Sequence, residues 1–350
     1  MNNDIINKNI ISNKSVNSGS RVSGETDLSK HSSNTEANSI TETNSITETN
    51  PITEENPVAG KINKQNVAKS FSKAAADYDK FAFIQREIGD RLFDRLSLMT
   101  LQPKIILDVG CGTGHYTRAL KKHYRKAQVH GVDIAPGMIE LADDKNGWLK
   151  NIGIKQCHYH CSDMNQLPFD DASVDLLFSN LALQWSDDLQ ATFAEFARVL
   201  KPEGLIIFST LGPDTLIELK KSWQAVDQST HVNQFIDMHI IGDELIKAGV
   251  ADPVMDMEKL TFTYSSVADV FKDLKGIGAH NMNAGRHTGL MSKGKWQAML
   301  NAYDNFKDEQ GLFPATYETI FGHGWGNQFK SISANQTGAS DVYKVSLEKN

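Results

Sequence analysis

The chain has 350 residues, a formal net charge of −7 and three cysteines. Residues 1–60 carry eight acids against four bases, a charge of −4, which leaves −3 for the remainder. The remainder is therefore only mildly acidic and shows no basic patch of the kind that binds nucleic acid, so nucleic acid is a disfavoured partner. No uninterrupted apolar stretch approaches the ~18 residues of a transmembrane helix, which argues against a membrane protein.

The N-terminal segment is rich in Asn, Ser, Thr and Glu and contains almost no aromatic residues. Three near-identical hexapeptides over residues 38–55 make part of it a low-complexity array. Such a segment buries too little apolar surface to offset the entropy lost on ordering it. We therefore expect disorder over 1–62, a folded domain over 63–326 and a polar tail over 327–350.

The chain shows no targeting signal, because neither a basic region nor an apolar region follows Met1. Cys111, Cys157 and Cys161 are too few and too unevenly placed for a disulfide framework. This cysteine usage agrees with a reducing compartment. The sequence thus predicts a cytoplasmic protein.

After residue 62 the hydrophobic pattern alternates between helical and strand-like segments. Apolar residues at helical spacing predict two helices over 63–100. Short apolar runs then predict strands near 105–107, 129–132, 157–161, 174–179 and 205–209. Helical patterns separate them over 115–124, after Pro136 and over 189–200. This alternation is typical of an α/β fold with a Rossmann-like, doubly wound, mostly parallel sheet.

The last part of the chain departs from the simple alternation. A helix is predicted over 242–248, a strand over 255–264 and a last strand over 314–321. Between the two strands, a helical insertion over about 267–311 is broken by a glycine-rich stretch. We expect this insertion to lie over the carboxyl ends of the sheet, where substrates bind in such folds.

The first predicted strand runs into the glycine loop Gly110-Cys111-Gly112-Thr113-Gly114, which opens the next helix. Glycines at such a turn let the backbone curve sharply and approach a ligand that a Cβ would block. The spacing G-x-G-x-G differs from the G-x-G-x-x-G fingerprint of dinucleotide-binding proteins. The loop therefore favours S-adenosylmethionine (SAM) over NAD.

Polar residues follow the next three predicted strands. Asp133 comes about twenty residues after the loop, where its carboxylate can accept both ribose hydroxyls. Asp163 can accept the adenine amino group while Met164 packs on the ring, and Asn180 lies beside the expected sulfonium. The residues expected to bind the cofactor from these motifs are Asp108, Gly110, Cys111, Gly112, Gly114, Asp133, Ile134, Asp163, Met164, Asn180 and Leu181.

Other candidate residues carry weaker signals. Residues 157–161 read Cys-His-Tyr-His-Cys, and on a strand the two cysteines face one side and the two histidines the other, which disfavours a metal site. Cys111 fits the loop as a small side chain rather than as a nucleophile. Trp185 belongs either to the core or to the methyl-transfer pocket, where its aromatic face would favour a sulfonium cation.

Beyond these widely shared motifs, the chain carries several more specific segments. They are Ser70-Phe71, Ala74-Ala75-Ala76-Asp77-Tyr78, Leu183-Gln184-Trp185, Ser209-Thr210-Leu211-Gly212-Pro213-Asp214-Thr215-Leu216, Leu274-Lys275-Gly276-Ile277-Gly278-Ala279 and Pro314-Ala315-Thr316-Tyr317-Glu318. Together they resemble the malonyl-[acyl-carrier protein] O-methyltransferases of biotin synthesis, the BioC type of class I SAM-dependent methyltransferase. The resemblance runs from about Val67 to Gly326, so it excludes the N-terminal extension and the tail.

The resemblance implies methylation of the free carboxylate of a malonyl group carried as a thioester on an acyl carrier protein. A carboxylic acid of pKa about 4 is already ionised at neutral pH, so the reaction needs positioning and desolvation rather than a catalytic base. Arg286, in the predicted insertion, is expected to pair with the malonyl carboxylate. Tyr78 is expected to cover the cofactor, and Arg86 to pair with its methionyl carboxylate.

Carrier proteins are typically acidic, so basic residues are expected near the pocket mouth. Because fold and cofactor do not set the acceptor, three alternatives stay open. The first is a methyltransferase of the same fold that acts on a quinone precursor or another small carboxylic acid. The second is a non-catalytic module that binds SAM or a carrier, and the third is a dinucleotide-dependent oxidoreductase.

Overall fold

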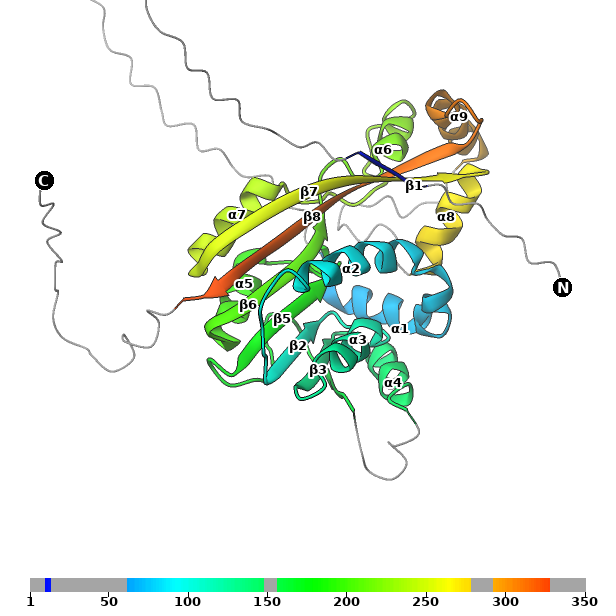
Figure 1. The fold of residues 1–350 in the computed structure, drawn as a ribbon. Helices are drawn as coiled ribbons and strands as arrows, with labels where there is room; N and C mark the ends of the chain where they lie inside the picture. Colours follow the sequence, from blue (N-terminus) through cyan, green and yellow to red (C-terminus); the bar gives the residue numbers. More distant parts are fainter. Residues whose placement is uncertain (1–9, 14–61, 148–155, 278–291, 328–350) are drawn as a thin grey trace, which may run out of the picture. The chain divides into compact units, whose positions relative to one another are not determined.

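The computed structural model describes residues 10–13, 62–147, 156–277 and 292–327. An eight-stranded sheet runs through them in the order β1-β7-β8-β6-β5-β2-β3-β4 (Figure 1). The strands are β1 Ile10–Asn13, β2 Ile105–Val109, β3 Gln128–Asp133, β4 His158–Cys161, β5 Val174–Asn180, β6 Leu200–Leu211, β7 Val250–Tyr264 and β8 Phe313–Gly326. The helices are α1 Lys64–Phe81, α2 Phe83–Leu96, α3 His115–His123, α4 Pro136–Asp144, α5 Leu189–Val199, α6 Ile217–Gln224, α7 Met238–Lys247, α8 Val267–Gly276 and α9 Lys293–Tyr303.

The strands β4, β3, β2, β5 and β6 pair in parallel, so their carboxyl ends lie along one edge of the sheet. β8 runs antiparallel between β6 and β7. The strand order reverses between β2 and β5, and the carboxyl ends beside such a switch point are the usual ligand site of an open α/β sheet. The Rossmann-like, mostly parallel fold predicted from the sequence is confirmed.

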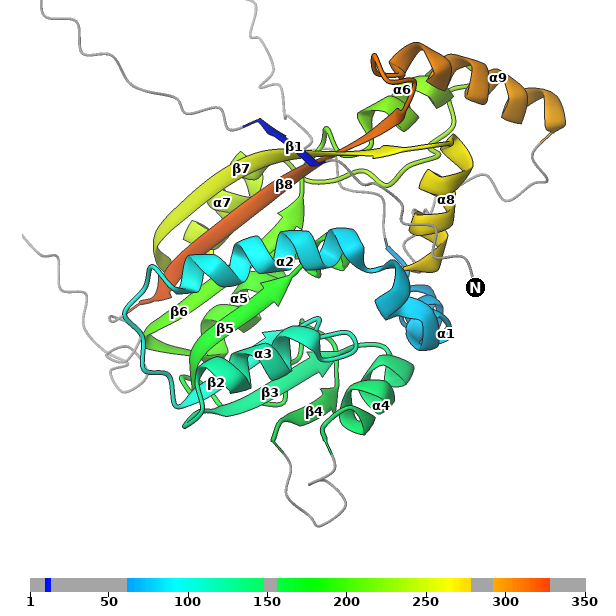
Figure 2. The same cartoon turned by 45° about the vertical axis from the view of Figure 1, so that its right-hand side comes forward.

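The core lies on both faces of the sheet, because successive strand residues point to opposite sides. Leu176 and Phe178 of β5 join the cluster under α2 and α3, whereas Leu177 joins Phe193 and Phe196 under α5. All five side chains are fully buried. Figure 2 shows α2 and α3 in front of the sheet, with α5 and α7 behind it. Burial on both faces explains why the parallel strands read as continuous apolar runs.

The predicted insertion is present between β7 and β8 as α8 and α9. α8 reaches down to the C-terminal part of α1, where a Cβ on Gly276 would come within 2.3 Å of the Phe81 ring (Figure 2). Each helix begins at a serine, Ser266 or Ser292, whose side chain accepts a backbone N–H of the first turn. The glycine-rich stretch between α8 and α9 is largely outside the described residues.

One short segment differs from the prediction. Ile10–Asn13, within the extension expected to be disordered, forms β1 and pairs antiparallel with β7 over residues 259–262. The unpaired backbone groups along the edge of β7 provide a template for an added strand, whatever the composition of the flanking chain. The expectation of disorder was therefore wrong for these four residues, and for 1–9 and 14–61 it stays a prediction. None of the described helices is both long and apolar enough to cross a bilayer.

Candidate active site

A cavity of about 940 Å³ opens at the carboxyl edge of the sheet. Val109, Asp133 and Asn180, the last residues of β2, β3 and β5, all line it. α1 contributes much of the opposite wall, and α8 contributes another part. The expectation that the insertion covers this edge is thus met by α8.

The glycine loop forms part of the cavity wall, and two of its glycines have different surroundings. Gly110 has a φ of +72°, and a Cβ there would lie 2.2 Å from the Cβ of Ala182. Gly112 has a φ of +52°, but a Cβ there would meet no protein atom within 4 Å. Gly110 is therefore needed for packing within the protein, whereas Gly112 leaves exposed backbone beside open space that a ligand can approach.

Asp133 holds the loop and keeps acceptor capacity for a ligand. Its Oδ2 accepts the N–H of Gly112 at 2.9 Å, and its Oδ1 accepts the N–H of Ala135 at 2.8 Å. Burial raises the pKa of this carboxyl. Each carboxylate oxygen retains a further lone pair, so both can accept ribose hydroxyls as the sequence predicted. This cradle fits SAM.

Asp163 and Met164 line the same cavity after β4. Lys64, the first residue of α1, lies 2.8 Å from Asp163 and 2.7 Å from Asp187. Burial lowers the pKa of Lys64, but its hydrogen bonds to the two carboxylates outweigh burial and raise it. The ion pair thus fastens the beginning of α1 over the half of the cavity where the adenine is expected.

A second polar cluster fastens the end of α1. Thr113 Oγ1 donates to Asp79 Oδ1 at 2.8 Å, and Lys145 pairs with the other oxygen of Asp79. Burial raises the pKa of Asp79, but the hydrogen bonds from Lys145 and Thr113 outweigh burial and lower it. α1 is therefore tied to the glycine loop and to the end of α4, and forms a cover over the cavity.

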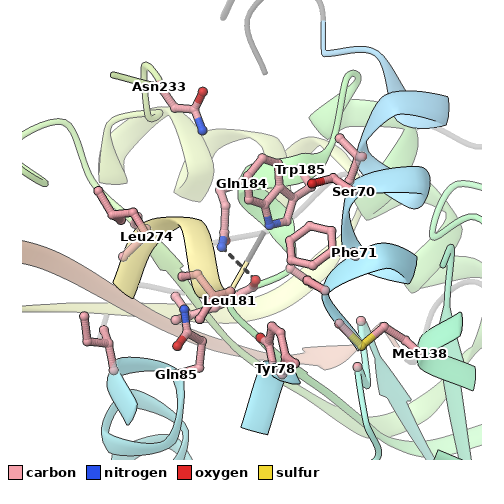
Figure 3. Close-up of a pocket in the computed structure, with 18 of the residues that line it drawn as sticks. Ser70, Phe71, Tyr78, Gln85, Met138, Leu181, Gln184, Trp185, Asn233 and Leu274 are labelled. Atoms are coloured by element: carbon pink, nitrogen blue, oxygen red, sulfur yellow. Dashed lines mark hydrogen bonds between the residues drawn. The ribbon is translucent and has the colours of Figure 1, made fainter. Parts of the chain in front are cut away.

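Aromatic residues of this cover meet Trp185 (Figure 3). The Phe71 ring lies edge-on to Trp185, with centroids 5.3 Å apart, and 6.4 Å from the Tyr78 ring. Trp185 is partly buried and lines the cavity, which favours the pocket over the core among its two predicted locations. Burial, followed by the nearby charge of Asp133, raises the pKa of Tyr78, so its phenol stays protonated at neutral pH.

Asn180 and Leu181, which the sequence predicts beside the sulfonium, line the cavity and are held by hydrogen bonds. Asn180 Nδ2 donates to the carbonyl of Gln85 at 2.9 Å, and its Oδ1 accepts Ser209 Oγ at 2.7 Å. Leu181 has a φ of +51°, a strained conformation for a branched side chain, and its carbonyl accepts Gln184 Nε2 at 2.7 Å (Figure 3). Strain of this kind is concentrated at functional sites.

Three predicted cofactor residues support the loop from behind and do not line the cavity. Asp108 is 2% exposed and accepts Thr117 Oγ1 at 2.6 Å. Cys111 is buried, and burial raises the pKa of its thiol well above the usual value, which agrees with a packing role. Gly114, at φ +74°, is the residue from which α3 begins. These residues thus support the loop, and the direct contacts with the cofactor expected of them stay a prediction.

Three further assignments remain, those of Arg86, Arg286 and Ile134. Arg86 does not line the cavity, because its guanidinium lies 3.4 Å from Asp79 and its carbonyl accepts the Tyr116 hydroxyl at 2.7 Å. Its expected contact with the methionyl carboxylate stays a prediction. Arg286 lies outside the described residues, and its role stays a prediction. Ile134, by contrast, lines the cavity beside Asp133 as expected.

Sequence reasoning missed most of the cavity wall that contains none of the cofactor residues expected from the sequence. This wall, the acceptor half of the cavity, consists of the end of β6, part of α6, the segment 231–235, α8 and Tyr317. Its lining side chains include Leu211, Leu216, Leu219, His231, Val232, Phe235 and Phe271. They are apolar or isolated in sequence, so no local pattern marks them.

The buried Asp108 provides a test of the support beneath the loop. Burial, offset in part by the Thr117 hydroxyl, raises its pKa to about 7. The folded protein therefore keeps a proton that the unfolded chain releases near pH 4, and this group's contribution to stability falls as pH rises from about 4 to 7. We expect the melting temperature of Asp108→Asn, measured relative to that of wild type, to be higher at pH 8 than at pH 5. The same difference at both pH values in thermal unfolding would contradict this.

Known proteins agree with the architecture of the site. A methyltransferase domain family matches residues 107–208, from the end of β2 to β6. The malonyl-[acyl-carrier protein] O-methyltransferase of Gallionella capsiferriformans is 48% identical over 75% of this chain and 91% of its own length. Proteins of that name from Laribacter hongkongensis and Coxiella burnetii are 47% and 43% identical, over 75% and 79% of this chain and 89% and 94% of their own lengths.

The sheet, the glycine loop and the carboxylate after β3 define a class I SAM-dependent methyltransferase. Within that class, the chain belongs to the malonyl-[acyl-carrier protein] O-methyltransferase family, because the similarity covers nearly the whole of these relatives.

Proposed function

We propose that this enzyme transfers a methyl group from SAM to the free carboxylate of a malonyl group carried by acyl carrier protein, in an early step of biotin synthesis. The observation that carries the proposal is the 48% identity to a relative of that name over 91% of the relative's length. The cytoplasmic location expected from the sequence belongs to the same proposal.

The size and lining of the cavity agree with the proposal. Pockets for one small molecule typically measure about 300–1,000 Å³, and 940 Å³ lies at the upper end of that range. The acceptor half is mainly apolar, with side chains such as Leu219, Val232 and Phe271. Such a lining removes water from a weak carboxylate nucleophile, which speeds its attack.

The reaction requires the protein to align the substrate carboxylate with the methyl group of SAM and to remove water from it. SAM, when bound, supplies an electrophilic methyl group on a sulfonium. Trp185 and Phe71 offer aromatic faces that favour a cation in this region. Tyr78 stays protonated, so it covers the site without acting as a base. The substrate carboxylate is already ionised at neutral pH, and no proton has to be removed from it.

Basic side chains at the rim of the cavity suit an acidic carrier. Lys73 on α1 and Lys272 and Lys275 on α8 line the cavity and are exposed. In the part of the chain that the structure describes, none of the three is seen in an ion pair. Exposed charges of this kind accelerate encounter with an oppositely charged partner and lose effect as salt is added.

The test is methyl transfer from labelled SAM to malonyl-acyl carrier protein, compared with succinyl-carrier, acetyl-carrier and malonyl-coenzyme A. We expect methyl ester to form preferentially on the malonyl carrier and none on the acetyl carrier, which lacks a free carboxylate. An enzyme that binds SAM but leaves the malonyl carrier unmodified would remove the assignment. Transfer to a quinone precursor or another free acid would change the proposed acceptor but not the class of enzyme.

A further inference from the structure

An ion-pair cluster joins three separate segments of the chain at the wall of the cavity. Lys64, the first residue of α1, lies 2.8 Å from Asp163, which follows β4, and 2.7 Å from Asp187, which precedes α5. Asn165 Nδ2 also lies 3.4 Å from Asp187 Oδ1, so the two loops approach each other here. Lys64 and Asp163 both line the cavity. We call these three charged residues the Lys64 bridge, because one ammonium group connects α1 with two loops.

The two ends of α1 are held differently. Its last residues continue through Ala82 into α2, where side chains such as Ile88 are fully buried. Asp79, near the same end, accepts a hydrogen bond from the glycine loop. In the first two turns, residues 64–71, the buried residue is Val67, and the others are partly buried or exposed. Movement of this beginning of α1 away from the loops therefore has to break the Lys64 bridge, whereas the end of α1 stays anchored.

The Lys64 bridge is partly exposed to solvent. The side chains of Lys64, Asp163 and Asp187 are 21%, 31% and 37% exposed. Ion pairs at such positions are modest in strength and weaken as salt is added. Segments that move to admit or release a ligand come from the less firmly held parts of a fold. The bridge is thus suited to close the cavity and to break again during cofactor exchange.

Asp163 connects the bridge with the cofactor. Its Oδ1 accepts the N–H of Asn165 at 3.0 Å, and its Oδ2 is the atom that pairs with Lys64. Each carboxylate oxygen keeps a further lone pair, so the amino group of adenine can still donate to Asp163, as the sequence predicts. Lys64 and adenine would then share one carboxylate, and the closed position of α1 and the bound cofactor would stabilise each other.

We infer that Lys64 is a positioning residue for the cofactor, which holds Asp163 in place and the beginning of α1 closed, and that the Lys64 bridge has to break before S-adenosylhomocysteine can leave. The bridge therefore sets the rate of cofactor exchange. The inference depends on SAM as the cofactor and does not depend on which acceptor receives the methyl group.

The test measures how fast S-adenosylhomocysteine leaves the full-length enzyme, by stopped-flow tryptophan fluorescence, to which Trp185 contributes from the cavity wall beside α1. We expect Lys64→Ala to release it about 3- to 10-fold faster, because two partly exposed ion pairs are lost. Added salt should accelerate release from wild type more than from Lys64→Ala. Lys64→Arg, which keeps the charge, should release it nearly as slowly as wild type.

The variants should fold, because α1 has its own cap. The Asn63 side chain accepts the N–H of Asn66 at 3.0 Å, so the start of the helix does not depend on Lys64. Thermal unfolding without ligand should therefore stay close to wild type. Asp187→Asn breaks one side of the bridge and leaves Asp163 unaltered, so it should also accelerate release.

Lys80→Ala is the matched control, because it removes an ion pair of α1, to Asp77 at 2.6 Å, that lies within the helix. It should leave the release rate within about 2-fold of the wild-type value. The inference would be overturned by a wild-type release rate in Lys64→Ala or by an equal acceleration in Lys80→Ala. An unchanged rate in Asp187→Asn would also overturn it, because the effect of Lys64 would then come from Asp163 alone.

Discussion

Gly112→Ala is expected to lose most SAM binding while the ligand-free protein stays nearly as stable as wild type. A Cβ at Gly112 would meet no protein atom within 4 Å, so the substitution costs only the strain of a left-handed alanine, about 1 kcal/mol. The same Cβ would occupy space that the cofactor needs beside the loop. We expect affinity for SAM to fall about 10- to 100-fold in calorimetry, with little change in thermal unfolding without ligand.

Gly110→Ala is the matched control, because Gly110 has a similar φ in the same loop. Its Cβ would lie 2.2 Å from the Cβ of Ala182, so this variant should lose about 2–5 kcal/mol of unfolding free energy from strain and overpacking. Ala182→Gly, combined with it, should restore part of that loss. If Gly112→Ala bound SAM as well as wild type, the open space beside the loop would not be the cofactor site.

The fold could largely be predicted because parallel strands that are buried on both faces appear in the sequence as continuous apolar runs. The run Leu176-Leu177-Phe178 supplies side chains to both core clusters, so it reads as continuously apolar. α6 was missed because the eight residues Ile217–Gln224 are short and largely polar outside the buried Leu219 and Trp223. β7 was predicted too short, because its first half alternates between partly buried and exposed residues and is ordered by pairing with β8.

The cofactor side of the site was predictable for a similar reason. Asp133 and Asn180 end β3 and β5, and Asp163 lies just after β4, and parallel strands bring their carboxyl ends together. The acceptor half has no such rule, because Leu211, His231 and other lining residues come from separate segments that only the folded chain brings together. A lone histidine in a polar segment gives no sign in the sequence that it will line a cavity.

Arg86 has a neighbour within the protein that the sequence did not indicate. A basic residue in a helix near the cofactor was a reasonable partner for a methionyl carboxylate. The sequence could not show that Asp79, on the neighbouring helix, would lie 3.4 Å from its guanidinium.

Asp133→Ala is expected to reduce SAM affinity at least about 100-fold, because two ribose hydroxyls lose a carboxylate acceptor and each such hydrogen bond contributes about 1.5–3 kcal/mol. The variant also removes the acceptor of the Gly112 and Ala135 N–H groups, so the loop loses its support. Asp133→Asn should lose affinity as well, since its amide NH₂ would face one of these N–H donors. Binding is measured by calorimetry and folding by thermal unfolding without ligand.

Asp175→Asn separates cofactor recognition from loop support. Asp175 also accepts two backbone N–H groups, those of Lys104 and Ile105 at 2.9 and 2.7 Å, but at the amino end of β2 and therefore at the opposite edge of the sheet. The Asp175→Asn variant should lose about as much stability as Asp133→Asn. Its affinity for SAM should stay within about 2-fold of the wild-type value, because Asp175 is far from the ribose contact. Equal losses of SAM affinity in both variants would mean that the effect of Asp133 comes from general destabilisation. A loss confined to Asp133 would identify its carboxylate as the ribose acceptor.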